Sequence, residues 1–417
     1  MIDFDLNTYQ AGDVLYLWWL GRPDTPVLIG ALRIARQTQG VSLTYGEAWL
    51  KTGFALSEDL PLDRREFFAV EKQTAAGAVD DARPDRWGER VIRFLDNPPR
   101  LAVLDFLFFA GDQRFGALGV SVSADAYVTR GMGALPQLAD AREIEELVRQ
   151  ILAGAPVSPH KRRLIASGAT LGGARPKALL NLDGDSWILK FNEPGEPVDL
   201  PLVEHATMTL AAQAGIRVAR TLPVKVRHGH AVAVKRFDRE ESGLRRHALS
   251  ANVALKAARE GLGYPELAQW LRRRGVTAGG LQLEHRQELF RRMVFNILID
   301  NTDDHEKNHA LLMTDSGEYA LSPAYDVLPS GQALGYQQMR VGINAADATL
   351  DNALSECAQF GLKKAEATAQ IKRVCAAVGG WQQHFVQAAV AAGDVSSLAA
   401  QIDRPFLREQ RDGWLQL

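Results

Sequence analysis

The sequence predicts an α+β protein whose β-rich N-terminal part is followed by a mixed middle part and a mostly helical C-terminal part. Three observations support this fold class. Short runs of alternating apolar and polar residues occupy roughly the first 75 positions, a glycine-rich segment and strand-like runs occupy the middle, and helical periodicity dominates from about residue 245. With 417 residues, the chain is long enough for two or three domains and a substantial core.

The N-terminal third is expected to form a small β-rich module and then three helices. Pro84 and Asp85 are typical of a helix start, and Pro98 and Pro99 stop that helix near Asp96. The third helix begins with acidic residues, which the helix dipole favours there. The expected elements are strands over residues 14–20, 27–34 and 41–49 and helices over residues 84–96, 101–110 and 140–152.

Turn residues delimit the later elements in the same way. Asp183 and Gly184 separate two apolar runs and predict a tight hairpin turn. Gly379 and Gly380 separate the last two clear helices. The expected elements are strands over residues 178–182, 186–191, 221–226 and 231–237 and helices over residues 202–214, 363–378 and 381–392.

Composition indicates a soluble, cytoplasmic protein. Hydrophobic residues make up 46% of the chain and charged residues 24%, and the formal net charge of −2 gives no global basic character for nucleic-acid binding. Two cysteines provide neither a disulfide framework nor zinc-ligand spacing. The acidic start is unlike a signal peptide, and no apolar run approaches the roughly 20 residues that span a bilayer, so we expect no membrane segment.

The most informative segment is a polar cluster that follows an apolar run at residues 295–299. Asp303 and Asn308 stand five positions apart, and Asp326 follows eighteen residues after Asn308. In kinases, a first Asp orients the acceptor hydroxyl, while an Asn five residues later and a second Asp hold Mg²⁺. The alternative is a helix end followed by a turn, where Asn, Asp and Thr are common.

The residue types suit this chemistry. Mg²⁺ prefers hard oxygen ligands, usually one or two carboxylates together with phosphate oxygens. Asn308 and Asp326 are the predicted metal ligands, and Asp303 is the predicted catalytic residue. His305 and Lys307, which lie between them, are candidate donors toward phosphate oxygens or a backbone carbonyl.

A glycine-rich segment at residues 167–177 is the candidate phosphate loop. Its glycines and small residues allow backbone N–H groups to approach phosphates closely. It matches neither the Walker loop nor the dinucleotide fingerprint, and by itself it is equally consistent with a surface loop.

The run after the predicted hairpin turn strengthens that interpretation. Lys190 lies inside an apolar strand, where a lysine is usually a solvated residue at the edge of a sheet. Because it directly follows a glycine-rich hairpin, it is predicted to contact ATP phosphates. Glu204, in the next helix pattern, is a candidate ion-pair partner of Lys190 or an exposed helix carboxylate. A later strand leads to Lys235, Arg236 and Phe237, whose main chain would bind adenine at a hinge.

Several ordered motifs of the chain resemble HipA-type serine/threonine kinases, the toxins of bacterial HipBA toxin–antitoxin modules. The resemblance runs from about residue 14 to the end of the chain. The matching motifs are residues 54–62, 81–88, 112–118, 170–177, 235–239, 246–251, 301–308 and 321–326.

This resemblance implies a two-lobed protein-kinase-like fold that uses ATP and Mg²⁺. It implies Asp303 as catalytic residue, Asn308 and Asp326 as metal ligands, and Lys190 as a phosphate contact. Family members can autophosphorylate a serine in the phosphate loop. Here the aligned position is Thr170, and Ser167 is a competing acceptor. The implied loop residues are Thr170, Leu171, Gly172, Gly173, Ala174, Arg175 and Lys177.

The same resemblance implies the partners and the domain layout. Family substrates include aminoacyl-tRNA synthetases, and a small helix-turn-helix antitoxin of HipB type would link the protein indirectly to DNA. We expect an N-terminal module over residues 1–155, a kinase N-lobe over 156–240 and a helical C-lobe over 241–417. A kinase-fold enzyme acting on a small molecule and a non-catalytic regulator remain the alternatives.

Overall fold

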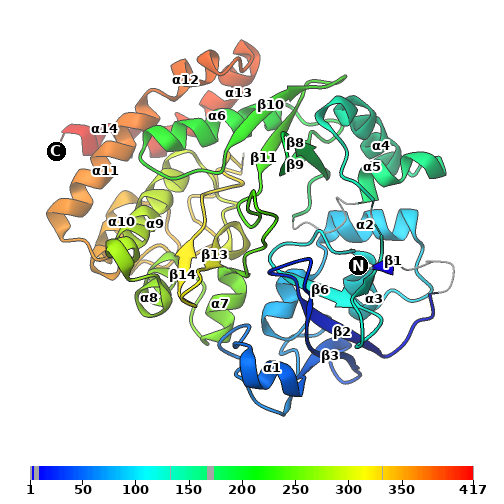
Figure 1. Cartoon of the computed structure of the whole chain (residues 1–417). Helices are drawn as coiled ribbons and strands as arrows, with labels where there is room; N and C mark the ends of the chain where they lie inside the picture. Colours follow the sequence, from blue (N-terminus) through cyan, green and yellow to red (C-terminus); the bar gives the residue numbers. More distant parts are fainter. Residues whose placement is uncertain (1, 4–8, 132, 167–172, 331, 417) are drawn as a thin grey trace. The chain divides into compact units, whose positions relative to one another are not determined.

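The computed structural model of the chain describes residues 2, 3, 9–131, 133–166, 173–330 and 332–416. It combines β-sheets with helices, which confirms the predicted α+β class (Figure 1). Residue contacts divide the chain into two compact units. The first unit contains Met1–Pro194, Val226–His228 and Lys235–Leu249, and the second contains Gly195–Lys225, Gly229–Val234 and Ser250–Leu417. The three domain ranges expected from the sequence stay a prediction.

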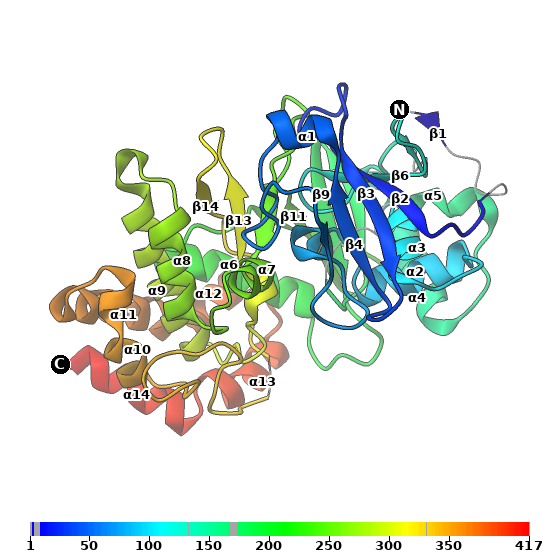
Figure 2. The ribbon, with the colours of Figure 1, turned by 90° about the horizontal axis from the view of Figure 1, so that it is seen from below.

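The first unit is built on an antiparallel five-stranded sheet with the order β5-β4-β3-β2-β6. Figure 2 shows its three longest strands running alongside one another. The predicted strands at residues 14–20 and 27–34 are confirmed. The strands are β2 (Val14–Trp19), β3 (Val27–Ala35), β4 (Gly40–Tyr45), β5 (Glu66–Phe67) and β6 (Leu118–Ser121).

The strand expected over residues 41–49 was predicted too long. It ends at Tyr45, and the short helix α1 (Glu47–Thr52) follows. Gly46 marks the change. Its N–H still bonds to β3, at the Ile29 carbonyl oxygen, whereas its own carbonyl oxygen accepts the Leu50 N–H and so begins the helix.

Helices and a second strand pair complete this unit, and the three helices expected from the sequence are all present. The fully buried α3 packs against the sheet strands β2, β3, β4 and β6. The helices are α2 (Arg86–Leu95), α3 (Val103–Phe109), α4 (Ala141–Ala153) and α5 (Arg163–Ala166), and β1 (Ile2–Asp3) pairs in parallel with β7 (Val128–Thr129).

The predicted hairpin forms from β8 (Lys177–Leu182) and β9 (Asp185–Phe191). Asp183 and Gly184 both have positive φ, 54° and 87°. Two such residues define a turn whose twist matches that of the flanking strands, as the Asp-Gly pair predicts.

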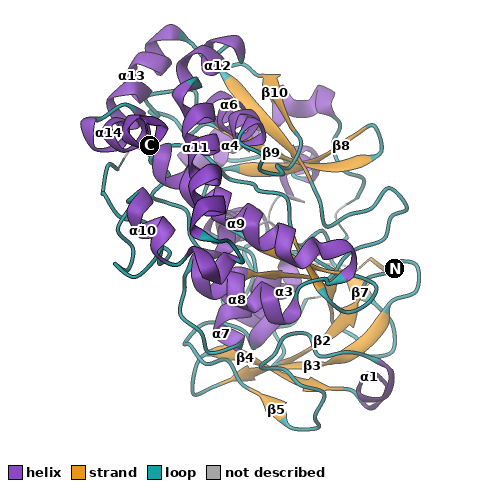
Figure 3. Cartoon of the chain, turned by 90° about the vertical axis from the view of Figure 1, so that its left-hand side faces the viewer, coloured by secondary structure: helices purple, strands orange, loops and turns teal. Residues whose placement is uncertain are grey.

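The second unit is mostly helical, as Figure 3 shows by colour. Its helices are α6 (Leu200–Gln213), α7 (Ala251–Ala257), α8 (Tyr264–Arg274), α9 (Leu281–Leu298), α10 (Leu350–Ser355), α11 (Lys364–Gly379), α12 (Trp381–Gln387), α13 (Ala392–Ile402) and α14 (Pro405–Gln416). Its strands include the antiparallel hairpins of β10 (Thr221–Lys225) with β11 (His230–Lys235) and of β13 (Ala310–Met313) with β14 (Tyr319–Leu321). The short strand β12 spans Ala248–Ser250.

One helix prediction in this unit was wrong in its extent. The helix expected over residues 381–392 ends at Gln387, and a new helix starts at Ala392. Ala389 takes a left-handed conformation with φ 65°, and Val390 turns into the core, so the helix cannot continue. Across the described ranges, none of the helices combines the length and the hydropathy needed to cross a membrane.

Candidate active site

The C-terminal end of α9 leads into the segment that the sequence singles out. This helix is buried over most of its last four turns, where α8, α10, α11 and β14 pack around it. It ends before Asp300, which has a left-handed φ of 57°. The buried Asp300 carboxylate accepts hydrogen bonds from the Arg404 guanidinium at 2.8 Å and from the Ala333 N–H at 3.1 Å. Burial raises the pKa of Asp300, and Arg404 opposes that shift.

Asp303 lies on the following turn with an exposed side chain. One of its carboxylate oxygens accepts a hydrogen bond from Gln338 Nε2 at 3.0 Å. Its main-chain oxygen accepts one from Asn308 Nδ2 at 3.4 Å. Asn308 is buried at the end of a single 3₁₀ turn, Glu306–Asn308. Because its amide nitrogen faces the Asp303 main chain, its side-chain oxygen points the other way.

A buried hydrogen-bond network supports this turn from behind. The Asp304 carboxylate accepts a hydrogen bond from the Tyr264 hydroxyl and another from His309 Nε2, the latter at 2.9 Å. Asn296 Nδ2 donates to the Tyr264 hydroxyl at 3.3 Å, and Asn301 Nδ2 donates to Asn296 Oδ1 at 3.1 Å. The network therefore links α8, α9 and the turn at residues 300–308, called the Asp303 turn below, through buried polar groups.

Asp304 is charged in this network despite its burial. Burial alone would raise the pKa of Asp304, but the charge of His309 and the hydrogen bonds from His309 and Tyr264 outweigh it and hold this pKa below its ordinary value. Burial, reinforced by the Asp304 charge, raises the pKa of Tyr264 well above its ordinary value. Tyr264 therefore stays protonated and keeps donating to Asp304.

Asp326 follows β14 and is half-buried, with a left-handed φ of 58°. A left-handed non-glycine residue costs free energy and is found more often at functional sites than elsewhere. The hydroxyl of the preceding Tyr325 donates to the Lys307 carbonyl oxygen at 2.7 Å. This bond joins the residue before Asp326 to the residue before Asn308.

Asn308 and Asp326 fit the ligand preferences of Mg²⁺. Both offer hard oxygen donors, and Mg²⁺ is usually held by one or two such side chains while water and phosphate oxygens fill its other positions. Among the described residues there is no group of three or more His, Cys, Asp and Glu side chains arranged around one point for a metal. The two residues are therefore candidates for a metal shared with a phosphate ligand.

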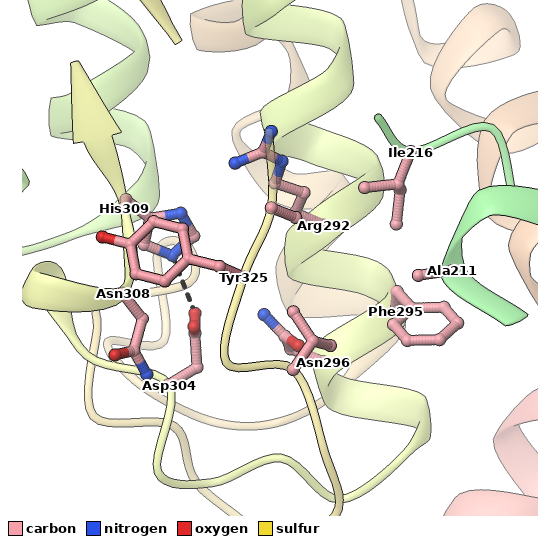
Figure 4. A pocket seen from close by; sticks show the side chains of 11 residues that line it. Ala211, Ile216, Arg292, Phe295, Asn296, Asp304, Asn308, His309 and Tyr325 are labelled. Atoms are coloured by element: carbon pink, nitrogen blue, oxygen red, sulfur yellow. Dashed lines mark hydrogen bonds and ion pairs between the residues drawn. The ribbon is translucent and has the colours of Figure 1, made fainter. Parts of the chain in front are cut away.

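A small cavity adjoins the Asp303 turn on its buried side (Figure 4). Asp304, Asn308, His309 and Tyr325 line one side of it, and Arg292 lies on α9 above them. Its free volume of about 10 Å³ is room for roughly one water molecule. The cavity is too small for a nucleotide, so we assign it to the buried packing beneath the Asp303 turn.

His305 and Lys307 occupy different environments on the same turn. Lys307 is exposed, as a phosphate-contacting residue would be, whereas His305 is half-buried. The buried Nδ1 of His305 has no hydrogen-bond partner among the described residues. The predicted donor roles of both residues stay predictions.

The candidate phosphate-binding lysine lies in the other compact unit. Lys190 on β9 is the cross-strand partner of Lys177 on β8, and both side chains are buried. Of the loop residues, Gly173 has a φ of 101°, Ala174 is exposed and Arg175 is half-buried. Ser167, Thr170, Leu171 and Gly172 lie outside the residues that the structure describes. The phosphate-binding and autophosphorylation assignments stay predictions.

The side chains of the predicted hinge are engaged within the protein. Lys235 forms an ion pair with Asp185 at 2.6 Å, and the Phe237 ring packs edge-on against Phe115. Arg236 is buried and makes a bidentate ion pair with Asp238. Adenine recognition through these residues would have to use the main chain, as the sequence predicts.

Glu204 lies on α6 and is buried, so it is not the exposed helix carboxylate of the alternative reading. Its predicted pairing with Lys190 stays a prediction.

Several supporting residues were not predicted from the sequence. The Asp303 turn is held through contacts that span 5 to 40 positions by Tyr264, Asn296, Asp300, His309 and Gln338. His309 follows the motif directly and Asp300 precedes it, so their proximity was a usable signal. Tyr264 and Gln338 have no such signal in their local sequence.

Comparison with known proteins defines the class. Residues 169–381 match the HipA-like C-terminal domain and residues 26–121 match the HipA N-terminal domain. The chain therefore belongs to the HipA family, and its fold is the α+β, kinase-like fold of that family.

Three comparisons illustrate this membership. The serine/threonine-protein kinase toxin HipA of Shewanella oneidensis is 26% identical over 352 residues, 72% of this chain and 73% of that protein. Y4dM of Sinorhizobium fredii is 34% identical over 161 residues, but the match spans only 35% of this chain and 37% of Y4dM. The solved HipA of Shewanella oneidensis MR-1, in complex with HipB and operator DNA, aligns with a TM-score of 0.63 at 18% identity over 96% of both chains.

Proposed function

We propose that this protein is an ATP- and Mg²⁺-dependent protein serine/threonine kinase and the toxin of a toxin–antitoxin module. One observation carries the proposal. An exposed Asp303 lies on the same turn as Asn308, and the Tyr325 hydroxyl joins the segment of Asp326 to that turn by a hydrogen bond of 2.7 Å. This combination of an exposed carboxylate and two oxygen ligands is the layout that phosphoryl transfer requires. The name of the Shewanella oneidensis relative supports the same assignment.

Each residue has a role in the proposed reaction. Asp303 accepts a hydrogen bond from the acceptor hydroxyl and orients it toward the γ-phosphate. Asn308 and Asp326 hold Mg²⁺, which neutralises charge on the phosphate oxygens when bound. Lys190 and the loop at residues 170–177 bind the phosphates, and the main chain at residues 235–237 binds adenine. His305 and Lys307 donate toward the phosphates, and Thr170 or Ser167 accepts phosphate during autophosphorylation.

The proposed biological context follows the relatives. We propose a protein substrate, such as an aminoacyl-tRNA synthetase in the cytoplasm. We also propose a small helix-turn-helix antitoxin of HipB type as partner, which would bring the protein to DNA indirectly. The solved HipA–HipB–operator DNA complex of Shewanella oneidensis supports this choice of partner.

Intact mass spectrometry of the purified protein with Mg-ATP tests the proposal. We expect a gain of one phosphate on Thr170 or Ser167, together with ³²P transfer to a protein acceptor. Asp303→Ala and Asp326→Ala should each reduce transfer by at least about a hundredfold, because both remove parts of the transition-state support. Asp315→Ala is the matched control, since Asp315 is exposed on the nearby hairpin turn between β13 and β14.

Three outcomes would contradict the proposal in different ways. Undiminished ³²P transfer by both site variants would remove the assignment of Asp303 and Asp326. Phosphate appearing only on a metabolite would favour a small-molecule phosphotransferase, and ATP binding without any turnover would favour a non-catalytic regulator.

A further inference from the structure

The first turn of α2 contacts the end of the glycine-rich segment within the same compact unit. Asp85 stands at the N-cap of α2, where Asp usually accepts a hydrogen bond from an N–H group of its own helix. Asp85 makes no such bond to its own helix. Its carboxylate instead accepts a hydrogen bond from the N–H of Gly173. Asp85 therefore binds the main chain of the loop with the carboxylate that would ordinarily cap its own helix.

Trp87, two residues later, holds the other end of the same short segment. Its ring is buried, with 2% of its surface exposed, and its Nε1 donates to the Lys177 carbonyl oxygen at 2.8 Å. The Pro176 carbonyl oxygen accepts a hydrogen bond from the Phe191 N–H at 3.0 Å, which starts the hairpin. Both contacts from α2 reach main-chain atoms, so they fix the path of the chain from Gly173 to Lys177.

That path determines where two cations lie. Lys177 and Lys190 are directly opposite each other on β8 and β9, so their side chains share one face of the hairpin. A Cβ atom on Gly173 would collide with the Lys177 ammonium, so this ammonium lies against the loop. Like charges directly opposite each other in a sheet are destabilising. The positions of the two ammonium groups therefore depend on how firmly the backbone of β8 and β9 is fixed.

We propose that Asp85 and Trp87 are positioning residues for nucleotide binding, through which the first turn of α2 fixes the backbone of residues 173–177 at the end of the predicted phosphate loop. This inference rests on the proposed ATP-dependent function. A backbone segment that is already fixed, as residues 173–177 are by these two hydrogen bonds, loses less conformational entropy when a ligand binds. Releasing either contact should therefore weaken ATP binding while the steps at Asp303 proceed as before.

The test compares four variants of the full chain in ATP KM, in kcat and in the Kd for a non-hydrolysable ATP analogue. Asp85→Ala removes a hydrogen bond to a charged acceptor and should raise KM and Kd about tenfold, with kcat changed less than about twofold. Trp87→Phe removes one neutral donor and should raise both about fivefold. Asp85→Asn should have a smaller effect than Asp85→Ala, because its amide oxygen can still accept the Gly173 N–H.

The matched control is Asp140→Ala. Asp140 precedes another helix of the same unit, α4, and its carboxylate accepts the Gln137 N–H at 2.8 Å. We expect its ATP KM to equal that of the wild type. Hydrogen exchange of the peptide covering residues 173–179 should accelerate in Asp85→Ala and not in Asp140→Ala.

Failure of this inference is distinct from failure of the proposed function. An active wild type with unchanged ATP KM and Kd in Asp85→Ala and Trp87→Phe overturns the inference alone. An equal rise of KM in Asp140→Ala also overturns it, because general loosening of the unit would then explain the effect. A wild type that neither binds the analogue nor transfers phosphate overturns the proposed function and this inference together.

Discussion

Two adjacent aspartates of the Asp303 turn have opposite environments. Asp303 is exposed, whereas Asp304 is buried and accepts hydrogen bonds from Tyr264 and His309. Exposure lets a carboxylate reach a substrate hydroxyl, while burial among donors makes it an anchor. Asp304 therefore holds the turn, and Asp303 is the residue presented outward.

The Tyr264 hydroxyl should contribute measurably to this anchor. Tyr264→Phe removes the donor to a buried charged carboxylate and the acceptor of the Asn296 amide. We expect the free energy of unfolding, measured by urea denaturation, to fall by about 2 kcal/mol. We also expect kcat for phosphoryl transfer to fall, because the turn that carries Asp303 becomes looser.

The exposed Tyr336 of the same unit provides the control. Tyr336→Phe removes the same atom at the surface and should leave both quantities unchanged. If Tyr264→Phe unfolds at the same urea concentration as the wild type, Asp304 is not anchored in the way described.

At the scale of elements, the segment after β11 is fastened to the N-terminal module. The Arg236 guanidinium donates to the carbonyl oxygens of Gln113 and Arg114, and Arg239 donates to those of Arg114 and Gly116. Both guanidiniums share the buried Asp238 carboxylate. The predicted hinge therefore continues into a buried ion cluster.

Asp238→Asn should test this cluster. Burial alone would raise the pKa of Asp238, but Arg236 and Arg239 and the Gly116 N–H hold it well below its ordinary value. The amide would leave two buried guanidiniums without their shared counter-charge. We expect a loss of about 3–5 kcal/mol in the free energy of unfolding of the first unit.

Glu240→Gln in the same segment is the matched control. Glu240 pairs with Arg246 at 2.7 Å, but the two side chains are 34% and 36% exposed. A partly exposed pair contributes less than about 1 kcal/mol. Equal losses in the two variants would show that burial does not distinguish the pairs.

Local patterns predicted elements better than their ends. The Asp183-Gly184 turn and the apolar periodicity of α11 are properties of neighbouring residues, so the sequence contains them. The end of β4 is less local, because Gly46 is held by Ile29 in another strand on one side and by the first turn of α1 on the other. Contacts of this kind are decided by tertiary packing, and the sequence alone does not indicate them.

The same division applies to the candidate site. Asp303, Asn308 and Asp326 stand out in the sequence by residue type and spacing, and the Tyr325–Lys307 hydrogen bond joins their segments. Tyr264 lies 40 positions before Asp304, and its hydroxyl is indistinguishable in sequence from that of any core tyrosine. Supporting residues of this kind become visible only when the fold brings them together.

At the scale of the whole molecule, a buried histidine joins distant parts of the first unit. His247 packs against the rings of Trp19 and Phe54, and its Nε2–H donates to the Leu56 carbonyl oxygen at 2.8 Å. The hydrogen bond spans 191 positions of the sequence. Burial lowers the pKa of His247 to about 4, and the hydrogen bond to Leu56 only partly opposes that shift.

This lowered pKa makes the stability of the unit depend on pH. The unfolded chain binds a proton at its ordinary pKa of about 6.5, whereas the folded chain binds it only near pH 4. Between these values the unfolded state binds more protons, so the free energy of unfolding falls as the pH is lowered. The full contribution is about 3 kcal/mol and is lost between about pH 6.5 and pH 4.

His247→Gln isolates this contribution, because Gln can still donate to Leu56 but does not titrate. His285 in the other unit also has a pKa lowered by burial to about 4, so the wild type and the variant must be compared with each other. We expect urea denaturation to show the two chains converging as the pH falls from 8 to 4.5, with the wild type losing more stability. If the free energies of unfolding of the two chains changed in parallel over this range, the pKa of His247 would be the same in the folded and unfolded chains.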